Sequence, residues 1–199
     1  MMCMLFYAWY GNTNSQAVCG IGSNSYSRTL GVTDGLGMTD TTPAQATSLT
    51  SARFWGIEAW WNCKYEWIGN VTSNNYVLTI KDMNTKQNRT VSGFVQRAGT
   101  YGWTSRMKIT EQGDFIPVAL GATDATSYCD ATNSNSGSRV VGRSYGNANT
   151  YGGVAYVSSN NAPSGAGASV GSRLAFNGVV TEAESVAAYK AALPAGQEA

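Results

Sequence analysis

The stretch from Arg139 to Phe176 most constrains what this chain can fold into. It begins with the β-branched pair Val140-Val141 and ends with Val170 and the run Arg173 to Phe176, and both ends are typical of strands that enter a core. Residues 142–169 between them are dominated by Gly, Asn, Ser, Ala and Tyr. Within this segment we expect Gly153, Val154 and Ala155 to form an inner strand that supports its neighbours from below.

The same region is almost free of charge. From Ala131 to Val179 the only charged residues are Arg139, Arg143 and Arg173. A segment of this kind makes a poor core but a good contact surface, because Tyr supplies rigid amphipathic area while Ser, Asn and Gly adapt their hydrogen bonding. The composition therefore predicts a binding face held between two structural strands.

Charge and hydropathy exclude several classes of partner. The chain has 199 residues and a net charge of +1 without a basic stripe, which argues against nucleic acid. No apolar run reaches the roughly 20 residues that span a bilayer, so membrane insertion is not expected. Residues 1–10 are apolar but lack a basic start and a cleavage site, so they make a poor signal peptide.

Catalysis and metal binding have few residues available. Histidine is absent, which removes the commonest general base and metal ligand. Glu58 and Glu66 could be a carboxylate pair for glycoside cleavage, but we favour structural roles for both. The four cysteines (Cys3, Cys19, Cys63, Cys129) allow three disulfide connectivities or none, and we favour free, mostly buried thiols. No cofactor is expected, although backbone carbonyls in a loop leave a calcium site open.

The rest of the chain predicts a strand-rich domain over residues 1–180, followed by a helix and frayed tail at 181–199. Residues 1–10 fit a buried helix or a buried strand, and the aromatic stretch 53–71 is expected to form the main core, with a sugar-binding platform as the alternative. Strands are predicted at 76–81, 89–95, 101–109 and 115–120, with turns at 82–88 and 111–114. Thr181 and Glu184 resemble a capping box for a helix over 181–193.

Three short blocks together resemble a known family. The matching positions are Asn62, Tyr65, Glu66 and Trp67 in the first block, Gly142, Ser144 and Tyr145 in the second, and Val170, Gly171 and Arg173 in the third. The pattern is similar to the C-type-lectin-like fold of the formylglycine-generating-enzyme (sulfatase-modifying factor) group. It is closer still to the ligand-binding branch in gut bacteria and their phages, which includes the variable proteins of diversity-generating retroelements.

The resemblance implies an α+β fold with short antiparallel strands, one or two helices and a large irregular loop layer. In the retroelement proteins, the segment between the second and third blocks carries the diversified surface residues, and residues 145–169 have the matching composition. By position, the expected ligand-binding residues are Tyr145, Asn147, Asn149, Tyr151, Tyr156, Ser158, Asn160 and Asn161.

The enzyme branch of this group uses a reactive cysteine pair in its distal region, whereas here no cysteine follows Cys129. We therefore expect a non-enzymatic receptor-binding domain, similar to an adhesin or a phage tropism determinant, at a cell surface or on a phage virion. Its partner would be a protein or glycan on another cell or particle. A structural virion or surface-appendage protein and, less favoured, an oxidase-branch enzyme are the alternatives, and the oligomeric state stays open.

Overall fold

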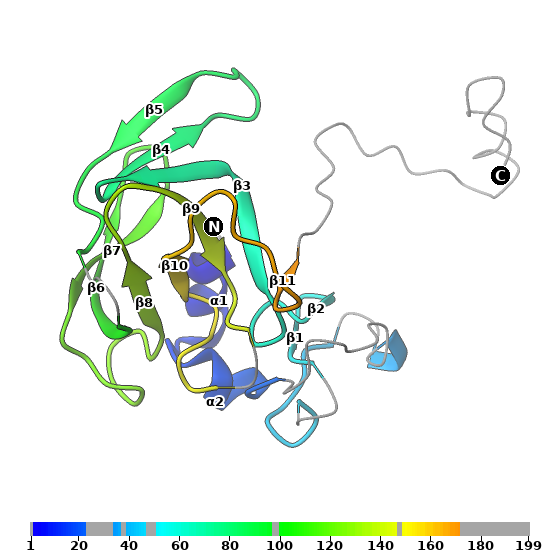
Figure 1. Ribbon diagram of the computed structural model, residues 1–199. Coiled ribbons are helices and arrows are strands. Elements are labelled where there is room, and N and C mark those ends of the chain that lie inside the picture. The colour runs from blue at the N-terminus through cyan, green and yellow to red at the C-terminus, as the bar shows by residue number, and fades with distance from the viewer. Residues whose placement is uncertain are drawn as a thin grey trace, which may run out of the picture.

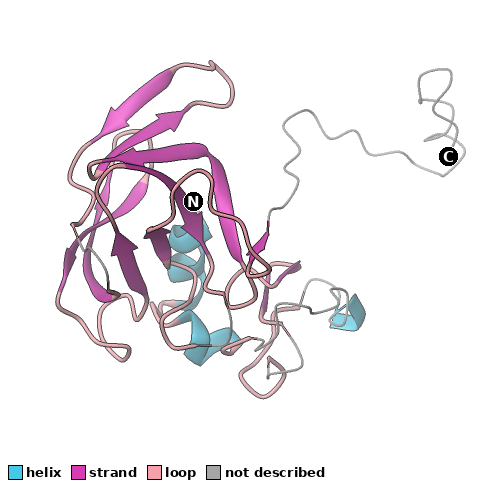
Figure 2. Cartoon of the chain, in the orientation of Figure 1, coloured by secondary structure: helices cyan, strands magenta, loops and turns pink. Residues whose placement is uncertain are grey.

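A curled sheet dominates the computed structural model, which describes residues 2–22, 34–36, 39–46, 51–96, 100–146 and 149–171. Within these residues the sheet has nine strands, in the order β5-β4-β3-β9-β10-β8-β6-β7 with β11 paired to β3 (Figures 1 and 2). The strands are β3 Tyr65–Asn74, β4 Val77–Lys81, β5 Asn88–Val91, β6 Gly102–Ile109, β7 Phe115–Leu120, β8 Ala131–Ser134, β9 Ser138–Arg143, β10 Val157–Ser159 and β11 Val170–Gly171.

Most neighbouring strands are antiparallel, but β10 pairs with β8 and β11 pairs with β3 in parallel. The four strands predicted between residues 76 and 120 are confirmed, with ends that shift by a few residues. The β3–β4 hairpin explains one shift: Asn75 and Tyr76 both have positive φ, at 47° and 66°. Positive φ at both loop positions is what a two-residue type I′ turn requires, so Tyr76 belongs to the turn.

The N-terminal residues form two short helices, α1 Met2–Tyr10 and α2 Ser15–Cys19. Helix α1 lies inside the curl of the sheet (Figure 1), so the helix is confirmed over the strand, but the helix is only partly buried: Phe6 is buried, whereas Ala8 and Trp9 are exposed. Helix α2 was not predicted from the sequence. Its start is fixed by the side chain of Asn14, which accepts a hydrogen bond from the Ala17 N–H at 2.9 Å.

Phe6 of α1 is the centre of the first core cluster. Its ring is fully buried and contacts Phe54 at 5.0 Å and Trp61 at 6.0 Å between centroids. The prediction that the aromatic stretch forms core is therefore correct for Phe54 and Trp61, but Trp55 is 40% exposed. A second cluster lies on the sheet, with Leu78, Ile80, Val91, Phe94, Ile116 and Val141 as its buried members.

A two-residue turn joins the short strands β1 Arg53–Phe54 and β2 Ile57–Glu58. A 3-10 turn, η1 Asp34–Leu36, precedes β1 in the chain. In the part of the chain that the structure describes, neither α-helix has the length and apolar character needed to cross a bilayer.

One predicted strand is wrong. Residues 153–155 form a buried turn, and the strand β10 begins only at Val157. The N–H groups of Val154 and Ala155 donate to Ser15 Oγ (3.0 Å) and Asp130 Oδ2 (2.7 Å) rather than to a neighbouring strand. The predicted helix at 181–193, the strand residues 173–176 and Asn147 lie outside the described residues.

Candidate functional site

Aromatic residues from three parts of the chain meet where β3 and β6 begin and β9 ends. We call this group the tyrosine cluster. Its members are Tyr65, Tyr101, Trp103, Tyr145, Tyr151 and Tyr156. Because Tyr145 follows β9 and Tyr156 precedes β10, the loop between these two strands carries half of the cluster.

Tyr145 lies at the centre of the cluster. Its ring centroid is 5.5 Å from that of Tyr65, 5.5 Å from Tyr101, 5.7 Å from Tyr151 and 5.4 Å from Tyr156, all with edge-to-face geometry. Pairs of this kind contribute about 0.5–1.5 kcal/mol each beyond the area they bury. The loop after β9 is therefore held by ring packing as well as by its backbone.

Tyr151 lies at the edge of the cluster. It stacks on Tyr101 at 5.0 Å with an interplanar angle of 23°, and it contacts Trp103 at 5.2 Å. Tyr145, Tyr151, Tyr101 and Trp103 are all half-buried, so part of each ring faces solvent. These four side chains give the cluster an accessible aromatic rim.

The phenol groups of the cluster bond to one another. Tyr101 Oη lies 3.2 Å from Tyr65 Oη and 3.3 Å from Tyr156 Oη. Burial raises the pKa of Tyr65 and Tyr156 above the ordinary value for a tyrosine, and it does the same for Tyr145. At neutral pH these hydroxyls are therefore hydrogen-bond donors and acceptors, and they do not act as bases.

The backbone around Asn149 anchors the loop to α2, to Asn62 in the segment before β3 and to β8. Asn149 O accepts from Asn62 Nδ2 at 3.1 Å and from Gln16 Nε2 at 2.9 Å. Asn149 Oδ1 accepts from the Tyr151 N–H at 2.9 Å, and Tyr151 O accepts from the Ala131 N–H at 2.9 Å. This anchoring gives Asn149 a structural role that its composition-based placement on the binding face did not reveal.

Gly152 and Gly153 form a tightly packed floor below the rim. A Cβ on Gly152 would lie 1.7 Å from Asn62 Oδ1, and one on Gly153 would lie 1.9 Å from Asp130 Oδ1. Asp130 is itself 1% exposed, and burial raises the pKa of its carboxyl well above 3.8. The expectation that residues 153–155 support the face from below agrees with their burial, although they are not a strand.

The predicted binding residues do not share one exposed surface. Tyr156 is 2% exposed and Ser158 is 6% exposed, so the expectation that they are displayed is wrong. The reason is that β10 is an interior strand of the sheet, where Ser158 pairs with Gly142 on one side and with Asn133 on the other.

The remaining residues divide between the two ends of β10. Tyr145, Asn149 and Tyr151 lie at the end where the tyrosine cluster forms. Asn160 lies at the other end, where its side chain accepts from Asn135 Nδ2 and its carbonyl accepts from Arg139 Nη1 at 3.2 Å. Asn161 lies there too, because its carbonyl accepts from the Val140 N–H at 3.1 Å.

The sequence reasoning missed Tyr101 and Trp103, which come from a strand far from the Tyr/Asn-rich loop. The sequence did contain one indication of them. Tyr101 and Trp103 are two residues apart at the start of the strand predicted at 101–109, so their side chains are expected on the same face of that strand. Nothing in the sequence indicated that this strand end would meet the loop at 145–156.

The three blocks that carry the family resemblance are neighbours in space. Glu66 of the first block forms an ion pair with Arg143, which follows Gly142 of the second block. Glu66 also pairs in register with Gly171 of the third block, across β3 and β11. The Arg143 guanidinium lies 3.6 Å from the Trp60 ring centroid and donates to Trp60 O at 2.7 Å. The central strands β9, β3 and β11 thus tie the blocks together.

The four cysteines form no disulfide, as predicted, and three of them are poorly suited to chemistry. Burial raises the pKa of Cys3 to about 12 and that of Cys19 to about 11, and it raises the pKa of Cys129 as well. The thiolate is the reactive form of cysteine, so these three side chains are weak nucleophiles at neutral pH. Among the described residues, no group of three or more His, Cys, Asp or Glu side chains could hold a metal ion.

No protein-family model, curated protein or solved structure matches this chain. The interpretation of the site therefore depends on its own geometry.

Proposed function

We propose that this protein is a non-enzymatic ligand-binding domain that contacts its partner through the rim of the tyrosine cluster. The observation that carries the proposal is the half-buried group Tyr101, Trp103, Tyr145 and Tyr151, which lies on a floor of buried glycines and hydrogen-bonded backbone. Partly exposed aromatic rings with polar tips are the side chains that most often provide the binding energy of an interface.

The rim is ordered before any ligand arrives. Tyr151 is fixed by stacking on Tyr101, by its N–H bond to Asn149 and by its carbonyl bond from Ala131. Ordering a rotamer-rich side chain on binding costs about 0.5–1.5 kcal/mol, and a side chain that is already fixed avoids most of that cost. A preorganised rim can therefore support useful affinity over a modest contact area.

Several observations favour binding over catalysis. The chain has no histidine, three of its four thiols have raised pKa values, and Glu66 is held in an ion pair with Arg143. The hydroxyls of Tyr65, Tyr101 and Tyr156 bond to one another, and burial raises the pKa of Tyr65 and Tyr156 above the ordinary value for tyrosine. The groups that line the rim can donate, accept and stack, which is the chemistry of recognition.

We further propose that the domain belongs to the ligand-binding branch of the C-type-lectin-like formylglycine-generating-enzyme group and acts at a cell surface or on a phage virion. Support comes from the contact between the three matching blocks on β9, β3 and β11. In this reading, the partner is a protein or glycan on another cell or particle.

Neighbouring DNA tests the membership in this branch. A near-identical template repeat that differs from codons 145–169 at adenines, beside a reverse transcriptase gene, is the expected finding. A locus without a template repeat and without a reverse transcriptase gene would contradict the retroelement assignment.

Binding itself is tested with a glycan array and a panel of intact bacterial cells. We expect the protein to bind at least one member, and Tyr151→Ala to reduce that binding at least tenfold while the circular dichroism spectrum stays unchanged. Ile109→Ala is the matched control, because Ile109 is a 60% exposed hydrophobic residue outside the tyrosine cluster. Binding that survives Tyr151→Ala, or that falls equally with Ile109→Ala, would overturn the assignment of the rim.

A further inference from the structure

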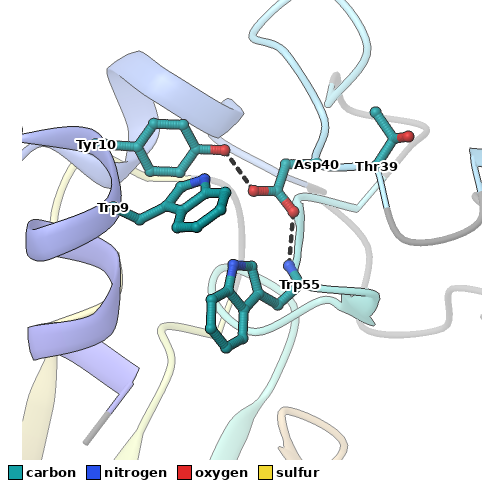
Figure 3. Close-up of a pocket in the computed structure, with 5 residues that line it drawn as sticks. All are labelled: Trp9, Tyr10, Thr39, Asp40 and Trp55. Carbon is teal, nitrogen blue, oxygen red and sulfur yellow. Dashed lines mark hydrogen bonds between the residues drawn. The ribbon is translucent and has the colours of Figure 1, made fainter.

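A second aromatic feature lies at the end of α1, outside the tyrosine cluster. It is a cavity of about 460 Å³ lined by Trp9, Tyr10, Thr39, Asp40 and Trp55 (Figure 3). Trp9 is 65% exposed and Trp55 is 40% exposed. Both are large apolar rings that folding leaves in contact with water.

The two indole rings form a corner. Their centroids are 5.7 Å apart and their planes meet at 86°, so each ring presents a face at nearly a right angle to the other. Asp40 lies beside both rings in Figure 3. We call Trp9, Asp40 and Trp55 the tryptophan corner.

The carboxylate of Asp40 is fixed in place. Asp40 Oδ2 accepts a hydrogen bond from the Tyr10 hydroxyl. Asp40 Oδ1 accepts one from the backbone N–H of Trp55 at 2.6 Å (Figure 3). Among the described residues, no lysine or arginine forms an ion pair with Asp40. The corner therefore combines two ring faces with a positioned negative charge.

The backbone at Trp55 gives independent support for a binding role. Trp55 and Gly56 form the two-residue turn between β1 and β2, with φ values of 50° and 72°. Type I′ turns strongly prefer Asn or Asp at the first of these positions, because bulky side chains disfavour positive φ. A tryptophan with positive φ and 40% exposure is poorly explained by folding, and such backbone strain is often found at ligand sites.

We propose that the tryptophan corner binds a quaternary or methylated ammonium group. A compact cation is attracted to the faces of aromatic rings, most strongly to tryptophan, and a nearby carboxylate adds charge complementarity. A pyranose is less suited, because it stacks flat on one ring, whereas the two indole planes here meet at 86°. This inference does not depend on the proposed role of the tyrosine cluster.

The test uses choline and its uncharged carbon isostere, 3,3-dimethyl-1-butanol, which have the same shape. Titrations of the whole protein are followed through the indole N–H signals of Trp9 and Trp55 by nuclear magnetic resonance. We expect choline to shift both signals saturably and the isostere to bind at least about tenfold more weakly. Equal binding of the two compounds, or no shift of either signal with choline, would overturn the proposal.

Two variants localise the effect. Trp55→Asn removes a ring but supplies a residue that the turn prefers, so it is expected to fold normally and to weaken choline binding at least about tenfold. Ile109→Ala is the control for loss of an exposed hydrophobic side chain and should bind choline normally.

Methyl glucoside is the third probe: a sugar that binds more tightly than choline would contradict the assignment of a cation.

Discussion

The tyrosine cluster and the tryptophan corner are both aromatic, but they use their rings in opposite ways. In the tyrosine cluster the rings cover one another and three of the hydroxyls bond to one another, so Tyr156 is buried and the other members are only half-exposed. In the tryptophan corner the rings touch at one edge, and Trp9 is 65% exposed. Aromatic rings whose faces are covered by other rings mainly stabilise a loop, whereas rings whose faces are exposed to solvent can bind a ligand.

The difference extends to the backbone below each group. Under the tyrosine cluster, glycines allow close approach to Asn62 and Asp130. Backbone groups of the loop bond to Cys3 of α1, to Ser15 of α2 and to Ala131 of β8. At the tryptophan corner, the turn at Trp55 has an unfavourable φ for its residue type. The tyrosine cluster therefore contributes more to the stability of the fold than the tryptophan corner does. Measurements of the free energy of unfolding on variants of each region test this difference.

The largest expected effect is at the buried end of the tyrosine cluster. Tyr156→Ala should lower the free energy of unfolding by about 3 kcal/mol or more, because it removes a ring that is 2% exposed and contacts Tyr65, Tyr101 and Tyr145. Trp9→Ala is the comparison, with an expected change within about 0.5 kcal/mol. Chemical denaturation measures the free energy of unfolding of both variants. Similar decreases in Tyr156→Ala and Trp9→Ala would contradict the claim that the two aromatic regions differ in their contribution to stability.

The glycine floor gives the next largest effect. Gly153→Ala places a methyl group against Asp130 and should cost about 1–3 kcal/mol, as overpacking of a tight interior does. Gly69→Ala is the matched control, because a Cβ on Gly69 would meet no atom within 4 Å. Thermal unfolding of both variants is the measurement. If Gly153→Ala unfolds at the same temperature as Gly69→Ala, the floor is less tightly packed than described.

The buried carboxyl of Asp130 makes stability depend on pH. Burial raises its folded pKa above 3.8, so the folded state holds this proton more tightly than the unfolded state does. The resulting stabilisation is complete below pH 3.8 and is lost as pH rises toward the folded pKa. Relative to Asp130→Asn, the wild type should therefore become more stable as pH falls from 7 toward 4, because the folded state takes up this proton more readily than the unfolded state does. A pH-independent difference between the two proteins would contradict a raised pKa.

The smallest expected effect is a gain at the tryptophan corner. Trp55→Asn replaces a residue with φ of 50° by one that tolerates this conformation, so stability should rise by a few tenths of a kcal/mol. The loss of the Trp9–Trp55 contact partly offsets the gain. Differential scanning calorimetry can detect the change, and a clear loss of stability would show that the tryptophan serves the fold instead.

Local patterns in the sequence predicted much of the sheet and little of the site. The strands between residues 76 and 120 were predictable because alternation and turn residues act over short distances. The meeting of Tyr101 with Tyr145 and Tyr151 depends on strand order, with β8, β10 and β9 between β6 and β3, and this order has no local signal. The family resemblance and their position between its second and third blocks placed Tyr156 and Ser158 at the surface, whereas the pairing of β10 with two strands buries them.

The tryptophan corner was hidden for a related reason. The aromatic stretch at 53–71 was expected to be core, and the density of rings around Trp61 supported that reading. Trp55 differs from Phe54 because the turn at residues 55–56 reverses the chain and points its side chain outward, as its 40% exposure shows. A Trp-Gly turn between two short strands is the sequence signal, but it is weak without the position of α1 and Asp40.

The most direct test of the account is a crossed binding experiment on Tyr151→Ala and Trp55→Asn. Both variants are titrated with choline and with the member of the glycan or cell panel that the wild type binds most tightly. We predict that Tyr151→Ala loses the panel ligand and keeps choline, whereas Trp55→Asn loses choline and keeps the panel ligand. A single variant that abolishes both, or a pair that abolishes neither, would contradict the view that the two aromatic groups are separate binding sites.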